Sequence, residues 1–161
     1  MKLTTAMLLT AAAVMAQSDA PAKSSAKPNH VLLTPDAMQW MPAPAATGMP
    51  SAVGVSLLSG DPFKTGPFVI RLKIPADGKI AAHWHPTDEN ITVIEGTFAA
   101  GMGDKFSEAE LHDFPVGSYV VMPKTMHHFA MAKGAEVIVQ IHGLGPFVLN
   151  YVDPADDPRK K

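Results

Sequence analysis

The chain has 161 residues, with 13 Lys and Arg against 15 Asp and Glu, and contains no cysteine. The lack of cysteine excludes disulfides, thiolate metal sites and a cysteine nucleophile. The near-neutral balance, with a sequence pI of about 6.4, provides no basic face of the kind that binds nucleic acid.

The first residues have the features of an export signal. Met1–Ala16 combines Lys2, a short apolar stretch and small residues just before Gln17, the order typical of a secretory signal peptide. We therefore expect cleavage before Gln17 and a periplasmic or extracellular protein. The alternative, an ordinary N-terminal helix, is disfavoured because the segment lacks helical periodicity. No segment of the sequence reaches the roughly 20 apolar residues that a membrane span needs.

The rest of the chain is expected to be one domain with flexible ends. Residues 17–29 are small, polar and contain proline, which is typical of a flexible tether. The folded domain is predicted for residues 30–152, beginning with an N-terminal arm. Residues 153–161 form a polar tail that contains two prolines.

From Ala52 onward, short apolar or alternating runs are separated by Gly, Pro and Asp, which indicates β-strands joined by turns. Only Phe106–His112 could form a single helical turn. Many short strands without a long helix predict an all-β antiparallel sandwich or barrel. The predicted strands are Ala52–Leu58, Phe68–Ile74, Ile80–His85, Ile91–Glu95, Thr97–Met102, Ser118–Met122, His128–Ala132, Glu136–His142 and Phe147–Val152.

Two histidines two positions apart predict a metal site on these strands. His83 and His85 can share a metal only on extended backbone, where side chains two apart point to the same face. Pro86 ends this strand, and the chain can then reverse its direction. A carboxylate at the start of the next strand would thereby lie close to the two imidazoles. Asp88 and Glu89 are both candidates, and strand parity favours Glu89, which falls on the same face as the apolar residues that follow.

These residues also carry a resemblance to a known family. Gly78-(x4)-His83-x-His85-(x3)-Glu89-(x6)-Gly96 resembles the first signature of the cupin superfamily, and Gly117-(x5)-Pro123-x-Thr125-(x2)-His128 resembles the second. The first spacer is one residue short, Thr125 stands where the family usually has Gly, and Ala132 stands where it often has Asn. The resemblance covers roughly residues 52–152, as in small single-domain bacterial cupins.

The resemblance implies a cupin-type antiparallel β-barrel, also described as a double-stranded β-helix or jelly roll, of six to eight strands. It also implies four metal ligands, His83, His85, Glu89 and His128. Strand periodicity alone slightly favours His127 over His128, because His127 shares its parity with Phe129 and Met131; the motif register favours His128, and we adopt the register. His127 then becomes a candidate for the pocket rim.

Two further side chains are candidates for the pocket. Gln140 and His142 share one face of their predicted strand and could line the space beside the metal. The alternative is that they face solvent while Val137, Val139 and Ile141 fill the core. The sequence favours neither arrangement.

A site of three imidazoles and one carboxylate suits a divalent transition metal, Mn, Fe, Co, Ni, Cu or Zn. It leaves coordination positions open for a substrate, so we expect a metal-dependent enzyme that acts on a small oxygen-bearing molecule, with Glu89 as the catalytic carboxylate. By resemblance to cupins, a dioxygenase is the leading expectation. A lyase or isomerase on the same site, or a non-catalytic cupin that binds a small ligand, is the alternative. A homodimer remains open.

Overall fold

Alternation of apolar and polar residues along two long strands organises the fold. In the computed structural model, which describes residues 30–161, β3 (Gly66–Ile74) and β10 (Val137–Gly145) pair antiparallel from Gly66 opposite Gly145 to Ile74 opposite Val137. Every second residue of each strand is buried through most of its length, since side chains two apart share a face. The inner faces of both strands therefore contribute to one apolar core.

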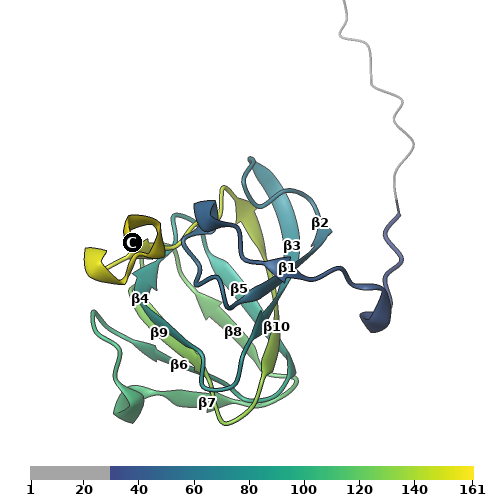
Figure 1. Cartoon of the computed structure of the whole chain (residues 1–161). Helices are drawn as coiled ribbons and strands as arrows, with labels where there is room; N and C mark the ends of the chain where they lie inside the picture. The colour runs from purple at the N-terminus through teal and green to yellow at the C-terminus, as the bar shows by residue number, and fades with distance from the viewer. Residues whose placement is uncertain (1–29) are drawn as a thin grey trace, which may run out of the picture. The chain divides into compact units, whose positions relative to one another are not determined.

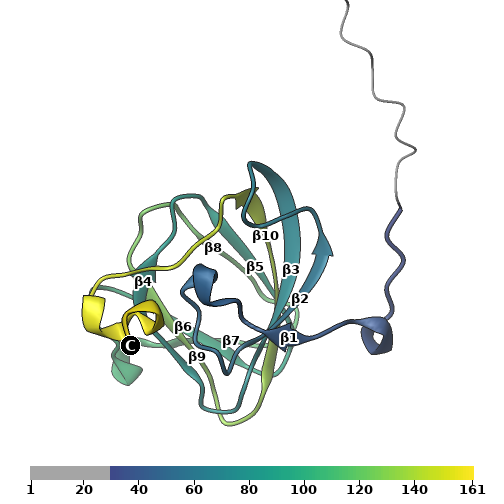
Figure 2. The same ribbon diagram turned by 45° about the horizontal axis from the view of Figure 1, so that its top comes forward.

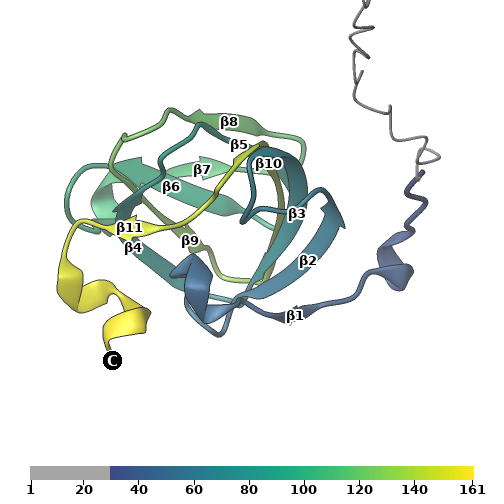
Figure 3. The ribbon, with the colours of Figure 1, turned by 90° about the horizontal axis from the view of Figure 1, so that it is seen from above.

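The strands form two antiparallel sheets that face each other (Figures 1 and 3). The first sheet has the order β1-β2-β3-β10-β5-β8, and the second has the order β11-β4-β9-β6-β7. This arrangement confirms the predicted all-β jelly roll. The remaining strands are β1 (Met41–Pro42), β2 (Gly54–Ser59), β4 (Lys79–Trp84), β5 (Glu89–Glu95), β6 (Phe98–Met102), β7 (His112–Phe114), β8 (Tyr119–Met122), β9 (His128–Ala132) and β11 (Asn150–Tyr151).

Two strands were not expected from the sequence, β1 in the N-terminal arm and β7. Each is three residues or fewer, too short to show an alternating pattern. The predicted helical turn within residues 106–112 is smaller than expected: it is the 3-10 turn η3 (Glu108–Glu110), and β7 starts at His112.

The turn between β5 and β6 requires a glycine. Gly96 has a φ of +75°, and a Cβ there would lie 2.5 Å from the carbonyl oxygen of Glu136. Any other residue would therefore strain the backbone and collide with the start of β10. This explains in physical terms the last glycine of the first cupin-like signature.

Short 3-10 turns occupy the arm and the C-terminal tail: η1 (Pro35–Ala37), η2 (Ala45–Thr47), η4 (Pro154–Asp156) and η5 (Pro158–Lys160). Figure 2 shows η2 and the segment between β10 and β11 crossing one end of the space between the sheets. The tail is held by Arg159, which binds the Asp157 carboxylate and donates to the carbonyl oxygen of Leu149 at 2.9 Å.

The predicted signal peptide and tether lie outside the described residues, so export stays a prediction. Within residues 30–161, no helix has the length and apolar character needed to cross a membrane.

Candidate metal centre

Three strands bring four polar side chains into the interior. His83 lies in β4 directly opposite His128, the first residue of the neighbouring strand β9. His85 follows the end of β4, and Glu89 opens β5 in the facing sheet. The cluster thus connects the two sheets, and each of the four residues is between 2% and 5% exposed.

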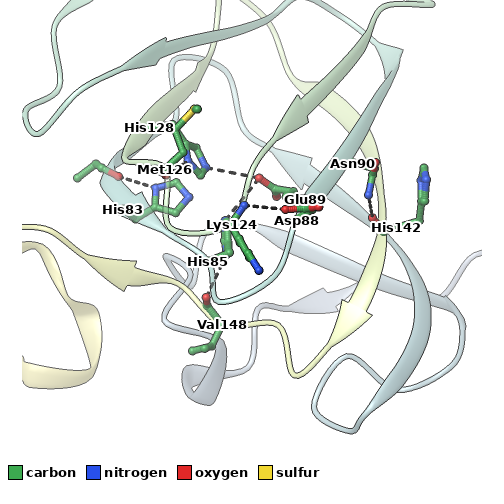
Figure 4. Close-up of polar contacts among 11 residues, drawn as sticks. His83, His85, Asp88, Glu89, Asn90, Lys124, Met126, His128, His142 and Val148 are labelled. Carbon is green, nitrogen blue, oxygen red and sulfur yellow. Dashed lines mark hydrogen bonds and ion pairs between the residues drawn. The ribbon is translucent and has the colours of Figure 1, made fainter.

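The three imidazoles converge closely enough to share one ion. One ring nitrogen from each of His83, His85 and His128 lies within 4.8 Å of the other two. The Glu89 carboxylate adds an oxygen, Oε2, that is 3.4 Å from Nε2 of His85 and 3.5 Å from Nε2 of His128. Figure 4 shows the carboxylate directed toward the imidazoles. The side chains therefore form one compact donor set of nitrogen and oxygen atoms.

Backbone carbonyls fix the orientation of each ring. Nδ1 of His83 lies 2.8 Å from the Ala81 oxygen, Nδ1 of His85 lies 3.0 Å from the Val148 oxygen, and Nδ1 of His128 lies 3.0 Å from the Met126 oxygen (Figure 4). A carbonyl oxygen only accepts, so each Nδ1 carries the proton and donates. The remaining nitrogen, Nε2, then keeps a free lone pair, which is the state in which a histidine binds a metal.

Burial sets the charge of the site. It holds the pKa of His83 well below its usual range, and the nearby His128 and His85 lower that pKa further, so the ring is neutral near pH 7. Burial by itself raises the pKa of the Glu89 carboxyl. The neighbouring His85 and His128 outweigh this effect, and the pKa of Glu89 lies well below its usual range. A neutral imidazole beside a carboxylate is a suitable ligand pair for a cation.

Two of these nitrogens make no hydrogen bond within residues 30–161 and have the Glu89 carboxylate nearby, at 3.4 and 3.5 Å. Nε2 of His85 and Nε2 of His128 are fully buried without a hydrogen bond among the described residues. A buried polar atom without a hydrogen bond costs about 1–3 kcal/mol, so two such atoms beside a carboxylate indicate a site suited to a cation. A divalent transition metal fits this donor set of three imidazole nitrogens and one carboxylate oxygen.

The space behind the cluster is small. A cavity of about 20 Å³ is bounded by His83, Glu89 and His128 and otherwise by apolar side chains of both sheets, among them Phe98 and Ile141. This volume holds about one water-sized occupant. The interior of the barrel is therefore filled mainly by side chains, with room for an ion but not for an organic molecule.

The other candidate residues lie outside this cluster. Asp88 turns away and accepts a hydrogen bond from the backbone N–H of Lys124 at 2.8 Å. His127 is 39% exposed and contacts the Asp104 carboxylate at 2.7 Å, so it is not part of the donor set. Strand parity pointed to His127 because Phe129 and Met131 are apolar, but Phe129 is buried on the outer face of its sheet, against Phe106.

Gln140 and His142 also point away from the cluster. Gln140 accepts a hydrogen bond from Nε of Arg71 at 3.2 Å, and the His142 ring stacks on Tyr119 with centroids 6.4 Å apart (Figure 4 shows His142). Val139 and Ile141, on the opposite face of β10, line the cavity instead. Of the two arrangements that the sequence left open, the structure therefore has the one in which Val137, Val139 and Ile141 fill the core.

The segment after β10 supplies contacts that the sequence did not indicate. The Phe147 ring stacks on the His85 ring, with centroids 4.4 Å apart and an angle of 14° between the planes. The next residue, Val148, provides the carbonyl that orients His85. These contacts join residues more than sixty positions apart, and this segment had been expected to be part of a strand.

Comparison with models of known protein families identifies the family to which the chain belongs. The model of the ChrR cupin-like domain matches residues 28–148, which is most of the chain. The chain belongs to the ChrR cupin-like family. A comparison with curated proteins finds no significant match.

Solved structures support the same fold for this cupin. The polyketide cyclase RemF from Streptomyces resistomycificus is similar with a TM-score of 0.63 and 14% identity, over 82% of this chain and 92% of that chain. An RmlC-like cupin from Ralstonia eutropha has a TM-score of 0.59 and 23% identity, and the match covers 80% of this chain and 75% of that chain. A chain of the complex of Rhodobacter sphaeroides SigE with the anti-sigma ChrR has a TM-score of 0.50 and 16% identity. The match covers 68% of this chain and 50% of that chain. At these identities the likeness concerns the fold alone.

Proposed function

We propose that the protein is a metal-dependent cupin enzyme in which His83, His85 and His128 bind one divalent transition metal and Glu89 completes the site. The observation that carries this proposal is the convergence of the imidazole nitrogens, two of which are buried without a hydrogen bond in the described part of the chain. A bound ion of this kind can act as a Lewis acid or support oxygen chemistry.

The side chains around the site have separate tasks in this proposal. The Glu89 carboxylate offsets part of the charge of the cation, because it is anionic while buried. The three backbone carbonyls hold the rings in the orientation that turns Nε2 inward. The apolar walls exclude water, which strengthens electrostatic interactions within the site.

We propose a small oxygen-bearing molecule as the substrate, with a dioxygenase reaction as the first to be tested. A lyase or isomerase reaction on the same side chains is the alternative, because the fold alone does not select a reaction. The cyclase activity of RemF is a property of that protein, and at 14% identity it gives only a reason to include non-oxidative reactions in the screen.

A binding or sensing role is the second candidate, and one observation favours it. The cavity behind the cluster measures about 20 Å³, which leaves no room for an organic substrate inside the barrel. A substrate would have to approach from outside or displace a side chain. A cupin that holds the metal ion without turning over an organic substrate needs no such opening.

The test compares the wild type with Glu89→Gln under several metals. The metal-loaded wild type is screened for oxygen uptake and for lyase and isomerase activity. The amide of Glu89→Gln keeps nearly the shape of the carboxylate but removes its charge, so turnover should fall about 10²-fold or more, while the melting temperature with metal changes little. A wild type that binds metal, stays inert in every screen and co-purifies with a stoichiometric small molecule would favour the binding role.

A further inference from the structure

A second, larger pocket lies under the N-terminal arm. It measures about 220 Å³ and is formed by the arm around β1 and η2, the inner face of β2, the loop before β3 and the Phe147 ring. None of the four residues of the candidate metal centre lines it. We call it the arm pocket; the lining residues that matter below are Met41, Met49, Val55, Leu57, Phe63 and Phe147.

The polar groups at the arm pocket already have partners within the protein. The Thr47 hydroxyl donates to the carbonyl oxygen of Pro44 at 2.7 Å and accepts from the N–H of Met49 at 3.1 Å. The Asp61 carboxylate accepts from the N–H of Phe63 at 2.9 Å and pairs with Lys64 at 2.9 Å. A polar ligand would gain little from these groups, and a charged one would find no opposite charge left unpaired. The pocket therefore suits an uncharged, apolar molecule.

The volume and the rim indicate the size of that molecule. An apolar cavity of about 150 Å³ in another protein binds benzene, so the arm pocket can hold a substituted benzene or a branched hydrocarbon of similar size. The rim residues Met41, Leu57 and Phe63 are 53%, 52% and 47% exposed, and a ligand would cover this apolar surface. Met41 and Met49 give the walls flexible side chains that adapt to different shapes.

Phe147 connects the arm pocket with His85. Its ring lines the pocket and stacks on the His85 ring at 4.4 Å. Its N–H donates to the carbonyl oxygen of Pro62, another residue of the pocket wall, at 2.7 Å. The next carbonyl, that of Val148, orients His85. These contacts connect the wall of the arm pocket directly to an imidazole of the candidate metal centre.

We propose that the arm pocket is a binding site for a small, uncharged, apolar molecule of about the size of a substituted benzene, and that its occupation is communicated to His85 through Phe147. Binding in the arm pocket requires no metal and no turnover. This site can therefore be tested on metal-free protein, independently of the proposed enzymatic function.

The experiment titrates toluene into metal-free protein labelled with ¹³C at the methionine methyl groups. The methyl resonances of Met41 and Met49 should shift and saturate, while that of Met102, which lies exposed on β6 outside the pocket, should not. The ring protons of His85 should shift with the same apparent Kd, because Phe147 lies between the ligand and that ring. The ring of His127, which faces solvent, serves as the second control.

Two matched variants locate the site. Leu57→Trp places a large ring in the pocket and should abolish the saturable shifts. Leu144→Trp makes the same substitution at a similarly exposed position, 60% against 52%, but on the outer face of β10, and should leave the shifts unchanged. If Leu57→Trp does not fold, Val55→Phe fills the same pocket with a smaller increase in volume.

The outcomes separate the two parts of the proposal. The absence of saturable shifts at Met41 and Met49 in folded wild type would overturn the site, as would unchanged shifts in a folded pocket-filling variant. Saturable shifts at these methionines without one at His85 would overturn the connection through Phe147. None of these results depends on whether the metal centre is catalytic.

Discussion

His127 and His128 are adjacent residues with opposite surroundings. The His127 ring faces solvent and contacts Asp104 at 2.7 Å. The His128 ring is buried, donates from Nδ1 to the carbonyl oxygen of Met126 and directs Nε2 toward Glu89. Only the second arrangement leaves a lone pair available inside the barrel, so the proposed function places the metal-binding role on His128 and not on His127.

This assignment predicts a difference between two alanine variants. His128→Ala should weaken metal affinity by at least about 100-fold, since even residues that only orient ligands contribute about 10–100-fold. His127→Ala should bind metal nearly as the wild type does. Competition titration with a chelating dye measures both affinities. The opposite ranking, in folded variants, would show that His127 is the ligand.

Thr125 occupies a backbone conformation that suits glycine. Its φ is +63°, in the left-handed region, which costs an L-residue roughly 1–2 kcal/mol and is especially unfavourable for a β-branched side chain. Its backbone N–H donates to the carbonyl oxygen of His85 at 2.9 Å, so the turn lies against the metal centre. The conformation explains in physical terms why the motif that the sequence resembles expects a glycine at this position.

Replacing Thr125 by glycine should relieve this strain. The gain is reduced by the greater freedom of glycine in the unfolded chain, about 0.5–1 kcal/mol, so Thr125→Gly should stabilise the protein by up to about 1 kcal/mol. Thr125→Ala keeps a Cβ and should gain less. Urea unfolding of the three proteins measures the difference, and a Thr125→Gly protein less stable than Thr125→Ala would contradict the explanation.

At the scale of elements, β10 separates the apolar core from the outer surface of its sheet. Ile141 is buried and lines the central cavity, while Leu144, three positions later, is exposed. We expect Ile141→Ala to cost about 2–5 kcal/mol, because it enlarges a cavity in the core. Leu144→Ala should change stability by no more than about 0.5 kcal/mol. Urea unfolding checks this, and equal costs would mean that the faces of β10 are assigned incorrectly.

The alternation of apolar and polar residues predicted the longer strands and the all-β antiparallel fold. In β3 and through most of β10, every second residue is buried. The resemblance to the cupin signatures predicted that His83, His85, Glu89 and His128 lie together, and the structure brings these four side chains together. Periodicity failed at β9, where all five residues are buried, because a strand covered on both faces shows no polar side.

Contacts between distant segments were beyond the reach of sequence patterns. Phe147 lies against His85 only because the segment after β10 crosses from one sheet to the other, and neither its sequence nor its spacing signals this contact. The arm pocket has the same origin: its walls come from the arm, from β2 and from Phe147. Tertiary packing, not local pattern, creates these sites.

At the scale of the whole molecule, the metal centre makes the stability of the metal-free protein depend on pH. The pKa of His83 is well below its ordinary value of 6.5, so the folded state keeps this ring neutral while the unfolded chain takes up a proton below about pH 6.5. The contribution of His83 to the free energy of unfolding is therefore fully present above this pH. It decreases as the pH falls toward the pKa of His83 in the folded state. Glu89, with its pKa lowered from 4.5, loses its contribution only at still lower pH.

The free energy of unfolding of the metal-free protein should therefore fall between pH 7.5 and pH 5.5, with a slope of at most about 1.4 kcal/mol per pH unit from His83. His83→Asn should flatten this dependence, whereas His112→Asn, at an exposed position, should not. Urea unfolding at several pH values measures the slope. A dependence that is unchanged in folded His83→Asn would contradict the role of this ring.

The most direct test of the account is elemental analysis of the full-length protein, purified without a nickel affinity step. A site built from His83, His85, His128 and Glu89 predicts one divalent transition-metal ion per chain in the wild type and in His127→Ala, and far less in folded His128→Ala. Folded wild type that contains no transition metal, and takes up none when offered Mn, Fe, Co, Ni, Cu or Zn, would contradict the central claim.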